Sequence, residues 1–298
     1  MKLKRVIIII VIVVIGLFLI YLAYQPLVGF LYLTSVKNQV EIVKDIKYSD
    51  QSFLDIYLPR NYTSSESLPV LILVHGGAWN SGSKEDFIYP AIGFAKQGYA
   101  TIAINYRLSN EAKFPAQIDD LKSSVNWIEN NANRYNLDRN NIGLLGGSAG
   151  AHLALLFGTE NQNKNIKAVV SISGPTNFLT ILSQCENSIY CSKSKLFLAE
   201  IIKQLLGCNI EDCPEKAKQA SPQYYVNQTN KLTSFLIIHG DRDEIVPIQQ
   251  SIDFNNALNQ NNISSELIIL KNTGHNVDTA VDFDINKVVS FLDKNLKK

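Results

Sequence analysis

Residues 142–150 read Ile-Gly-Leu-Leu-Gly-Gly-Ser-Ala-Gly, an apolar run that leads directly into a G-x-S-x-G motif. An apolar helical pattern, 151–156, follows at once. A strand, a tight turn and a helix in this order form the context in which a serine is presented at the end of a sheet. The small residues Gly146 and Gly150 allow the strand and the helix to approach closely. We therefore predict that Ser148 is a nucleophile.

Short apolar runs of the same kind recur along the chain, and continuous runs are typical of central strands that are covered on both faces. They are Val70–Val74, Ala100–Asn105, Ile142–Leu145, Ala168–Ile172, Phe235–Ile238 and Leu267–Leu270. Two alternating runs precede them, Glu41–Tyr48 and Ser52–Leu58, which predict an antiparallel pair at a sheet edge.

Amphipathic stretches of helical length lie between the strands, for example Pro115–Tyr135, Pro247–Leu258 and Asp282–Leu296. Alternating strands and helices predict an α/β fold with right-handed crossovers. The expected architecture is a mostly parallel, twisted, eight-stranded sheet with helices on both faces. Active sites of such sheets lie at the carboxyl ends of the strands.

Composition excludes several classes of protein. The 298 residues include 28 Lys and Arg and 27 Asp and Glu, for a net charge of +1. This balance gives no electrostatic signal for nucleic acid binding. A hydrophobic content of 46% excludes a disordered chain. We expect one domain over residues 40–298, and the composition carries no signal for an oligomeric state.

The first 39 residues differ from the rest. Three basic residues, Lys2, Lys4 and Arg5, precede the uncharged run Val6–Tyr24, which is long enough to cross a hydrocarbon layer of about 30 Å. The positive-inside rule places the basic end in the cytoplasm. We predict a single N-terminal transmembrane helix that acts as an uncleaved signal anchor, with a connector up to residue 39 and the domain outside the cytoplasm. The alternative is a cleaved signal peptide and a secreted protein.

A serine hydroxyl needs a base, and the chain has four histidines. His75 ends a predicted strand before a glycine-rich loop, and His152 lies on the helix after Ser148, where packing is expected. His239 ends another strand, where a structural hydrogen bond is expected. His275 lies late in the chain, in a loop after the last strand, and is the best candidate for the base.

The residue that orients the base should be a carboxylate after the seventh strand, in the order Ser, Asp, His. Asp241, Asp243 and Glu244 all occur in the segment 239–247. Their spacing alone does not choose between them. The chosen carboxylate would hold the imidazole of His275 in one tautomer and stabilise its protonated form.

All four cysteines fall between the sixth and seventh strands, at 185, 191, 208 and 213. No C-x-x-C pair is present, so a zinc site is not expected. In an oxidising compartment we expect two disulfides, with 185–191 and 208–213 favoured among the three possible connectivities. Four reduced thiols are the alternative.

Several motifs occur together and in order: His75-Gly76-Gly77-Ala78-Trp79, Asn105–Leu108, Phe114–Ala116, Gly146–Gly150, Ala220–Pro222 and His239–Pro247. Together they resemble the α/β-hydrolase superfamily, and within it the esterase/lipase group that includes feruloyl-esterase-like (BD-FAE) and hormone-sensitive-lipase-like enzymes. The resemblance covers about Glu41 to Leu296. It implies an α/β-hydrolase fold with a cap inserted after the sixth strand, at about residues 175–220.

The resemblance also implies roles for single residues. The H-G-x-x-D-x-x-V-P pattern makes Asp243 the catalytic acid. The oxyanion hole would consist of the N–H groups of Gly77, Ala78 and Ala149, with Gly76 as an alternative by one position.

Two further residues are paired by the resemblance. Asp120 matches a position that pairs with the arginine after the fourth strand, here Arg107, and we expect this pair to be structural. The sequence departs from many hormone-sensitive-lipase-like members at Ala78, where they carry a third glycine. Together with Trp79, this favours the feruloyl-esterase-like and arylformamidase-like branches.

These residues predict a serine hydrolase with the triad Ser148, Asp243 and His275, which cleaves a small-molecule acyl ester through an acyl-enzyme. The mechanism needs neither a metal nor another cofactor. An amidase or arylformamidase with the same triad is the alternative. A non-catalytic binding module on the same scaffold is a further alternative, although such modules typically lose the serine or the histidine.

Overall fold

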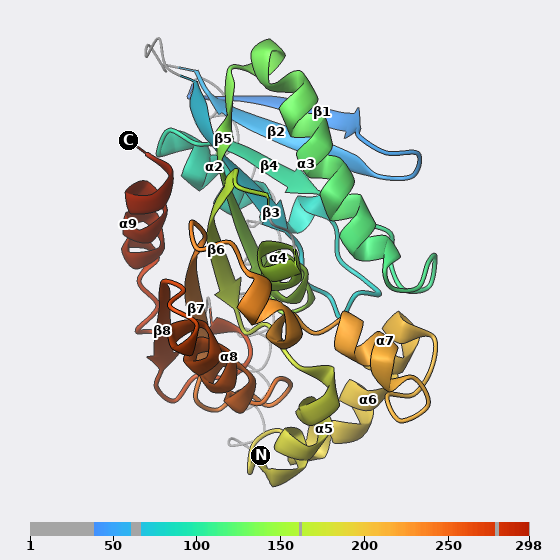
Figure 1. The fold of residues 1–298 in the computed structure, drawn as a ribbon. Coiled ribbons are helices and arrows are strands. Elements are labelled where there is room, and N and C mark those ends of the chain that lie inside the picture. Colours follow the sequence, from blue (N-terminus) through green and yellow to red (C-terminus); the bar gives the residue numbers. More distant parts are fainter. Residues whose placement is uncertain (1–38, 61–66, 161–162, 278–279, 298) are drawn as a thin grey trace, which may run out of the picture.

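An eight-stranded sheet forms the centre of the molecule (Figure 1). The computed structural model describes residues 39–60, 67–160, 163–277 and 280–297. The strands are β1 (Val40–Lys47), β2 (Phe53–Pro59), β3 (Leu68–Val74), β4 (Ala100–Ile104), β5 (Leu137–Gly147), β6 (Ile166–Ile172), β7 (Ser234–Gly240) and β8 (Ser265–Leu270). Their spatial order is β1-β2-β4-β3-β5-β6-β7-β8.

The strand directions agree with the sequence analysis. β2 pairs antiparallel with both β1 and β4, and the remaining neighbours pair parallel. The predicted antiparallel pair at an edge is therefore confirmed. The apolar run 267–270, in contrast, is not a central strand. β8 is the other edge, and Ile269 is 45% exposed, because no strand follows it in the sheet.

Helices cover both faces of the sheet (Figure 1). They are η1 (Lys84–Phe87), α2 (Ile88–Lys96), α3 (Ala116–Tyr135), α4 (Ala149–Glu160), α5 (Phe178–Asn187), η2 (Ser192–Ser194), α6 (Lys195–Leu206), α7 (Pro214–Gln219), η3 (Pro222–Gln228), α8 (Gln249–Gln260) and α9 (Ile285–Leu296). One hydrophobic core lies under α2 and α9, and the other lies under α3, α4 and α8.

Helix α3 illustrates how the sequence forms these layers. Its buried residues Ile118, Leu121, Val125 and Ile128 recur every three or four positions and face the core. The helix ends at Asn136, which adopts the left-handed conformation (φ 53°) that asparagine tolerates better than most residues. The chain then enters β5, which carries Ser148 at its far end.

The segment between β6 and β7 contains α5, η2, α6 and α7, where the cap was expected. Two disulfides bracket α6, one between Cys185 and Cys191 and one between Cys208 and Cys213. The favoured sequence-near pairing is thus the pairing that the structure has. The first bridge closes the connection between α5 and η2, and the second closes the connection between α6 and α7.

The predicted membrane anchor lies outside the described residues, because the run Val6–Tyr24 falls within 1–38. Among the helices of the described ranges, none combines the length and the hydropathy that crossing a bilayer requires.

Candidate active site

Ser148 occupies the sharp turn between β5 and α4. Its φ of 51° is in the left-handed region, which a serine adopts only under constraint. The turn requires glycines on both sides. A Cβ on Gly146 would lie 2.4 Å from Gly150, and a Cβ on Gly150 would lie 2.0 Å from the carbonyl oxygen of Val74. The amide of Ser148 donates to the carbonyl of Ile172 at 2.8 Å, which ties the turn to β6.

The structure brings together the three side chains that the sequence analysis selected. The Oγ of Ser148 lies 2.9 Å from Nε2 of His275, and Nδ1 of His275 lies 2.8 Å from Oδ2 of Asp243. The Asp243 side chain is fully buried, and the His275 side chain is 11% exposed. Since Nδ1 faces a carboxylate, it carries the proton, and Nε2 is left free to accept one from Ser148.

Asp243 is held as a carboxylate by its surroundings. Burial by itself would raise its pKa, but hydrogen bonds from His239 and His275 overcome this and hold the pKa of Asp243 well below its usual value. Its other oxygen, Oδ1, accepts from the amides of Ile245 and Val246, each at 2.8 Å. The carboxylate is therefore ionised and fixed in orientation.

The two competing carboxylates do not reach the imidazole ring of His275 by any hydrogen bond that the described residues make. Oδ1 of Asp241 accepts from the amide of Thr273 at 3.3 Å. Glu244 accepts from the backbone amide of His275 at 3.2 Å. Asp241 and Glu244 thus contact the backbone of the loop that carries His275, while Asp243 contacts its ring.

His239 is fully buried and lies behind Asp243. Its Nε2 is 3.0 Å from Oδ2 of Asp243 and 3.0 Å from the carbonyl of Val246, while its Nδ1 is 2.7 Å from Oγ of Ser251. The expected structural hydrogen bond is present. The contact with Asp243 was not predicted from the sequence, where the only signal is the spacing of four between the two residues.

His152 is a packing residue, as expected, and is fully buried. Its Nδ1 accepts from the indole N–H of Trp79 at 3.2 Å, and its Nε2 donates to the carbonyl of Ala220 at 2.6 Å. Burial lowers the pKa of His152 to about 4, so the ring is neutral. The two hydrogen bonds connect the loop after β3 to the end of the cap segment.

The loop after β3 runs beside Ser148. Gly77, Ala78 and Trp79 all have positive φ, of 101°, 52° and 59°. A Cβ on Gly77 would lie 2.3 Å from the carbonyl oxygen of Ser81, so only glycine fits there. Gly76 is close to the turn as well, since a Cβ on it would lie 3.6 Å from that of Ser148.

The backbone amides of residues 76–78 and 149 are the candidate donors of an oxyanion hole. Within the part of the chain that the structure describes, no hydrogen bond to another protein group uses the N–H of Gly76, Gly77, Ala78 or Ala149. Ala149 is the first residue of α4, where an amide has no partner within the helix and the helix dipole is positive. Among the described residues these N–H groups are therefore left without a protein acceptor, as the donors of an oxyanion hole must be.

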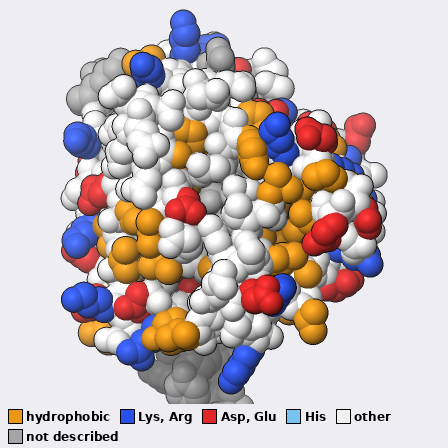
Figure 2. Space-filling view, turned by 60° about the horizontal axis from the view of Figure 1, so that its bottom comes forward, with side chains coloured by type: hydrophobic (Ala, Val, Ile, Leu, Met, Phe, Trp, Pro, Cys, Tyr) orange, Lys and Arg blue, Asp and Glu red, His pale blue; other side chains and the backbone are white. Residues whose placement is uncertain are grey.

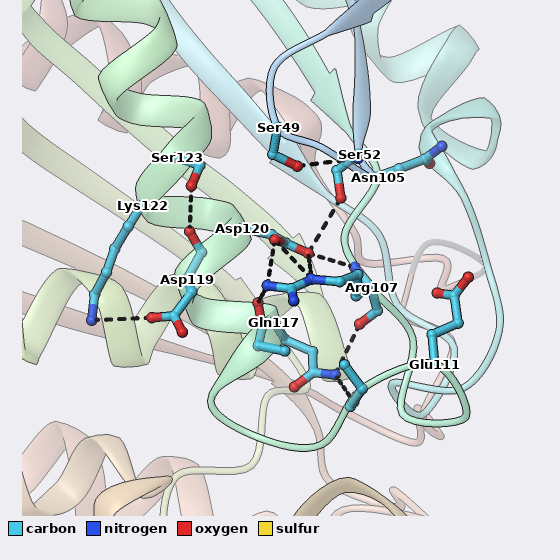
Figure 3. A network of polar contacts seen from close by, with 12 residues as sticks. Ser49, Ser52, Asn105, Arg107, Glu111, Gln117, Asp119, Asp120, Lys122 and Ser123 are labelled. Carbon is cyan, nitrogen blue, oxygen red and sulfur yellow. Dashed lines mark hydrogen bonds and ion pairs between the residues drawn. The ribbon is translucent and has the colours of Figure 1, made fainter.

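A polar network lies between the segment that follows β4 and helix α3 (Figure 3), and this segment contacts the loop after β3. Arg107 forms an ion pair with the buried Asp120, with Nη2 2.8 Å from Oδ1, and Asp120 also accepts from the backbone amide of Arg107 at 2.7 Å. The amide of Ser109 then donates to the carbonyl of Trp79 at 2.7 Å, and Tyr106 stacks on His75. The pair is structural, as expected, because it holds the segment that supports the β3 loop.

A cavity of about 710 Å³ opens at Ser148 and His275. Its volume is within the range of small-molecule sites. Phe197, Leu198 and Ile201 of α6 line one part of it, so the cap segment borders the site. Helices α2 and α9 also contribute side chains to the lining, which no motif in the sequence predicted.

Curated proteins of related sequence match most of the chain. The chain is 31% identical over 224 residues to Esterase LipC of Mycobacterium tuberculosis, and the match covers 70% of this chain and 53% of that protein. It is 25% identical over 256 residues to isoprenylcysteine alpha-carbonyl methylesterase ICME of Arabidopsis thaliana, covering 79% and 56%. The chain thus spans about half the length of these curated relatives.

Solved structures show the same fold. A truncated carbohydrate esterase from gut microbiota matches with a TM-score of 0.71 at 25% identity, covering 88% of this chain and 98% of that one. A bacterial heroin esterase matches with a TM-score of 0.76 at 19% identity, covering 93% and 90%, which is a likeness of fold alone. The family model named BD-FAE matches residues 54–258, well over half of the chain. The chain belongs to the BD-FAE family and has the α/β-hydrolase fold.

Proposed function

We propose that this protein is a serine carboxylesterase that hydrolyses small-molecule acyl esters through an acyl-enzyme. The observation that carries the proposal is the hydrogen-bonded series from Ser148 Oγ through His275 to Asp243, with distances of 2.9 and 2.8 Å. The esterase names of the relatives, LipC and ICME among them, support the same reaction class. Ser148 is the nucleophile, His275 the base, and Asp243 the acid that orients it.

In the first half-reaction, Nε2 of His275 takes the proton of Ser148 as the serine oxygen attacks the ester carbonyl. The N–H groups of Gly77, Ala78 and Ala149 stabilise the negative oxygen of the tetrahedral intermediate. Each such donor contributes about 3–4 kcal/mol to transition-state stabilisation. His275 then protonates the leaving alcohol, and the acyl group stays on Ser148.

In the second half-reaction, His275 removes a proton from water, and the resulting hydroxide attacks the acyl-enzyme carbonyl. The same N–H groups hold the second tetrahedral intermediate. When it collapses, His275 returns its proton to the oxygen of Ser148, and the carboxylic acid leaves. Asp243 stays ionised throughout, because its role is to hold the tautomer of His275 and to stabilise the imidazolium.

A fluorophosphonate probe tests the proposal, since it labels only an activated serine. We expect the wild-type protein to be labelled and to hydrolyse p-nitrophenyl esters. Ser148→Ala should lose both properties while its circular dichroism spectrum and melting temperature stay close to those of the wild type. Labelling of Ser148→Ala at the wild-type level, or a wild-type protein that neither labels nor hydrolyses any ester, would overturn the proposal.

We also propose that the domain works outside the cytoplasm, attached to a membrane through the apolar run Val6–Tyr24. The basic residues before this run and the two disulfides of the cap segment support this location, because disulfides persist in oxidising compartments. Protease added to intact cells or spheroplasts should cleave the domain, and detergent should be needed to extract it. A domain protected from protease until lysis contradicts the proposed location.

A further inference from the structure

The chemistry of the cavity at Ser148 narrows the class of substrate. Among the lining residues in the described part of the chain, only Asp86 and His275 are ionisable. Asp86 is exposed and already accepts a hydrogen bond from the amide of Ser83 at 3.0 Å. The lining also includes Asn80 and Ser81, which already donate to Gln204 and to the carbonyl of Gly77, and Asn276 beside the catalytic histidine. The rest is mostly aliphatic and aromatic. A negatively charged substrate group would therefore find no lysine or arginine on the described lining of this cavity.

One part of this lining comes from two helices on the same face of the sheet, and we call it the α2–α9 wall. It consists of Phe87, Pro90 and Phe94, which precede or belong to α2, and of Phe283, Ile285 and Val288, which precede or belong to α9. Positions 87, 90 and 94 fall on one side of a helix. Phe94 and Val288 are buried, at 4% and 0% exposure, whereas Ile285 is 47% exposed, so the wall runs from the core to the surface.

The cap contributes a second apolar surface to the same cavity. Leu198, Ile201 and Phe197 of α6 line it; the first two side chains are buried, and Phe197 is 52% exposed. Figure 2 looks at the end of the molecule where the cap lies and shows hydrophobic side chains gathered in patches between the charged ones. Both the α2–α9 wall and α6 thus carry apolar side chains from the cavity to the surface.

We propose that the α2–α9 wall binds an uncharged hydrocarbon group of the ester, and that the substrate is an apolar ester rather than an acylated sugar. This inference rests on the proposed esterase function. Apolar surface removed from water stabilises a bound hydrocarbon chain in proportion to its length. The hydroxyl groups of a sugar would lose their hydrogen bonds to water against this wall, and it carries no polar side chain to replace them.

The hydrocarbon group has two possible sources, because an ester carries one group on its acyl side and one on its alcohol side. Two substrate series separate them. In p-nitrophenyl esters from acetate to decanoate only the acyl chain grows, and in alkyl acetates from methyl to octyl only the alcohol grows. We expect kcat/KM to rise by up to about fourfold per added methylene in one of the series, as long as the chain remains in contact with apolar side chains.

The decisive variant is Ile285→Asp, which places a carboxylate on the wall at a half-exposed position that tolerates it. Its matched control is Val281→Asp, since Val281 is fully exposed and does not line the cavity. The ratio to compare is kcat/KM for the eight-carbon substrate of the favoured series divided by kcat/KM for its shortest substrate. We expect Ile285→Asp to lower this ratio roughly fivefold or more. Val281→Asp should leave this ratio at the wild-type value.

Phe283→Ala provides a second variant, which removes apolar surface without adding charge, and it should lower the same ratio. Acetylated xylo-oligosaccharides serve as the sugar probe and should be poorer substrates than the octyl esters. The inference is overturned if neither variant changes the ratio, or if the acetylated sugar is hydrolysed faster than every alkyl ester. Fluorophosphonate labelling in the same preparations shows that the proposed function stands even where this inference fails.

Discussion

His239 and Asp243 form a buried contact at the back of the site, with Nε2 of His239 3.0 Å from Oδ2 of Asp243. Nε2 faces two acceptors, this oxygen and the carbonyl of Val246, so it carries the proton. Nδ1 then accepts from the hydroxyl of Ser251 at 2.7 Å. Oδ2 of Asp243 therefore receives hydrogen bonds from two imidazoles, and only one of them, His275, reaches Ser148.

Removing this contact should slow catalysis without weakening substrate binding. Hydrogen bonds to a charged group contribute about 1.5–3 kcal/mol, so His239→Leu should lower kcat about 10- to 100-fold while KM changes little. His239→Gln retains an N–H that can reach Asp243 and should recover part of the loss. Steady-state kinetics on correctly folded samples checks this. Equal kcat in both variants and the wild type would show that His239 has no part in positioning Asp243.

The choice of Asp243 over Asp241 is tested by replacing each with asparagine. In Asp243→Asn an amide N–H₂ faces the ring N–H of His275, which favours the wrong tautomer, and kcat should fall by about 10⁴-fold. Asp241→Asn retains the oxygen that accepts from Thr273 and should be close to wild type. Kinetics of the two variants side by side provides the matched comparison, and a greater loss in Asp241→Asn would reverse the assignment.

His152 should make the fold sensitive to acid. Burial lowers its pKa from 6.5 to about 4 in the folded state, so the unfolded state binds more protons between these values. The stability contributed by the neutral ring is complete above pH 6.5 and is lost as the pH falls towards 4. Between pH 7 and 4.5 the wild type should lose about 2–3 kcal/mol of unfolding free energy through this group.

His152→Gln is the comparison for this prediction, because glutamine does not titrate and can hydrogen-bond to the same neighbours. Urea unfolding at pH 7 and at pH 4.5 should show a smaller loss of stability in the variant. Parallel losses in both proteins would mean that His152 does not titrate as described.

The close approach of α4 to β3 predicts a contrast between two glycines. Gly150→Ala places a Cβ 2.0 Å from a backbone oxygen, so α4 must move and carry Ser148 with it. We expect a loss of about 3 kcal/mol or more in stability, together with a loss of activity. Gly93→Ala in α2 meets no atom within 4 Å and should stabilise the protein by about 0.5–1 kcal/mol. Thermal melts should show a lower melting temperature than the wild type for Gly150→Ala and a slightly higher one for Gly93→Ala.

Local patterns sufficed for much of the fold and part of the site. The continuous apolar runs predicted the central strands because strands covered on both faces carry apolar side chains at every position. The run at 267–270 shows where this reasoning fails, since apolar residues also occur in an edge strand, here β8. The motif 146–150 predicted the turn at Ser148, because only small neighbours permit a strand and a helix to meet so closely.

The amino-acid sequence by itself determined the order of strands and helices, the turn that presents Ser148 and the selection of His275 from four histidines. Spacing alone left three carboxylates open after β7, and the resemblance of the 239–247 pattern to a known family selected Asp243 among them. Only the tertiary structure decided that the Asp243 side chain meets the His275 ring, that His239 contacts the same carboxylate, and that α2 and α9 share one wall of the cavity. The reason is that the secondary structure of a segment depends largely on residues that are close together along the chain. The direction of a loop side chain and the meeting of distant helices depend instead on packing between segments that are far apart in sequence.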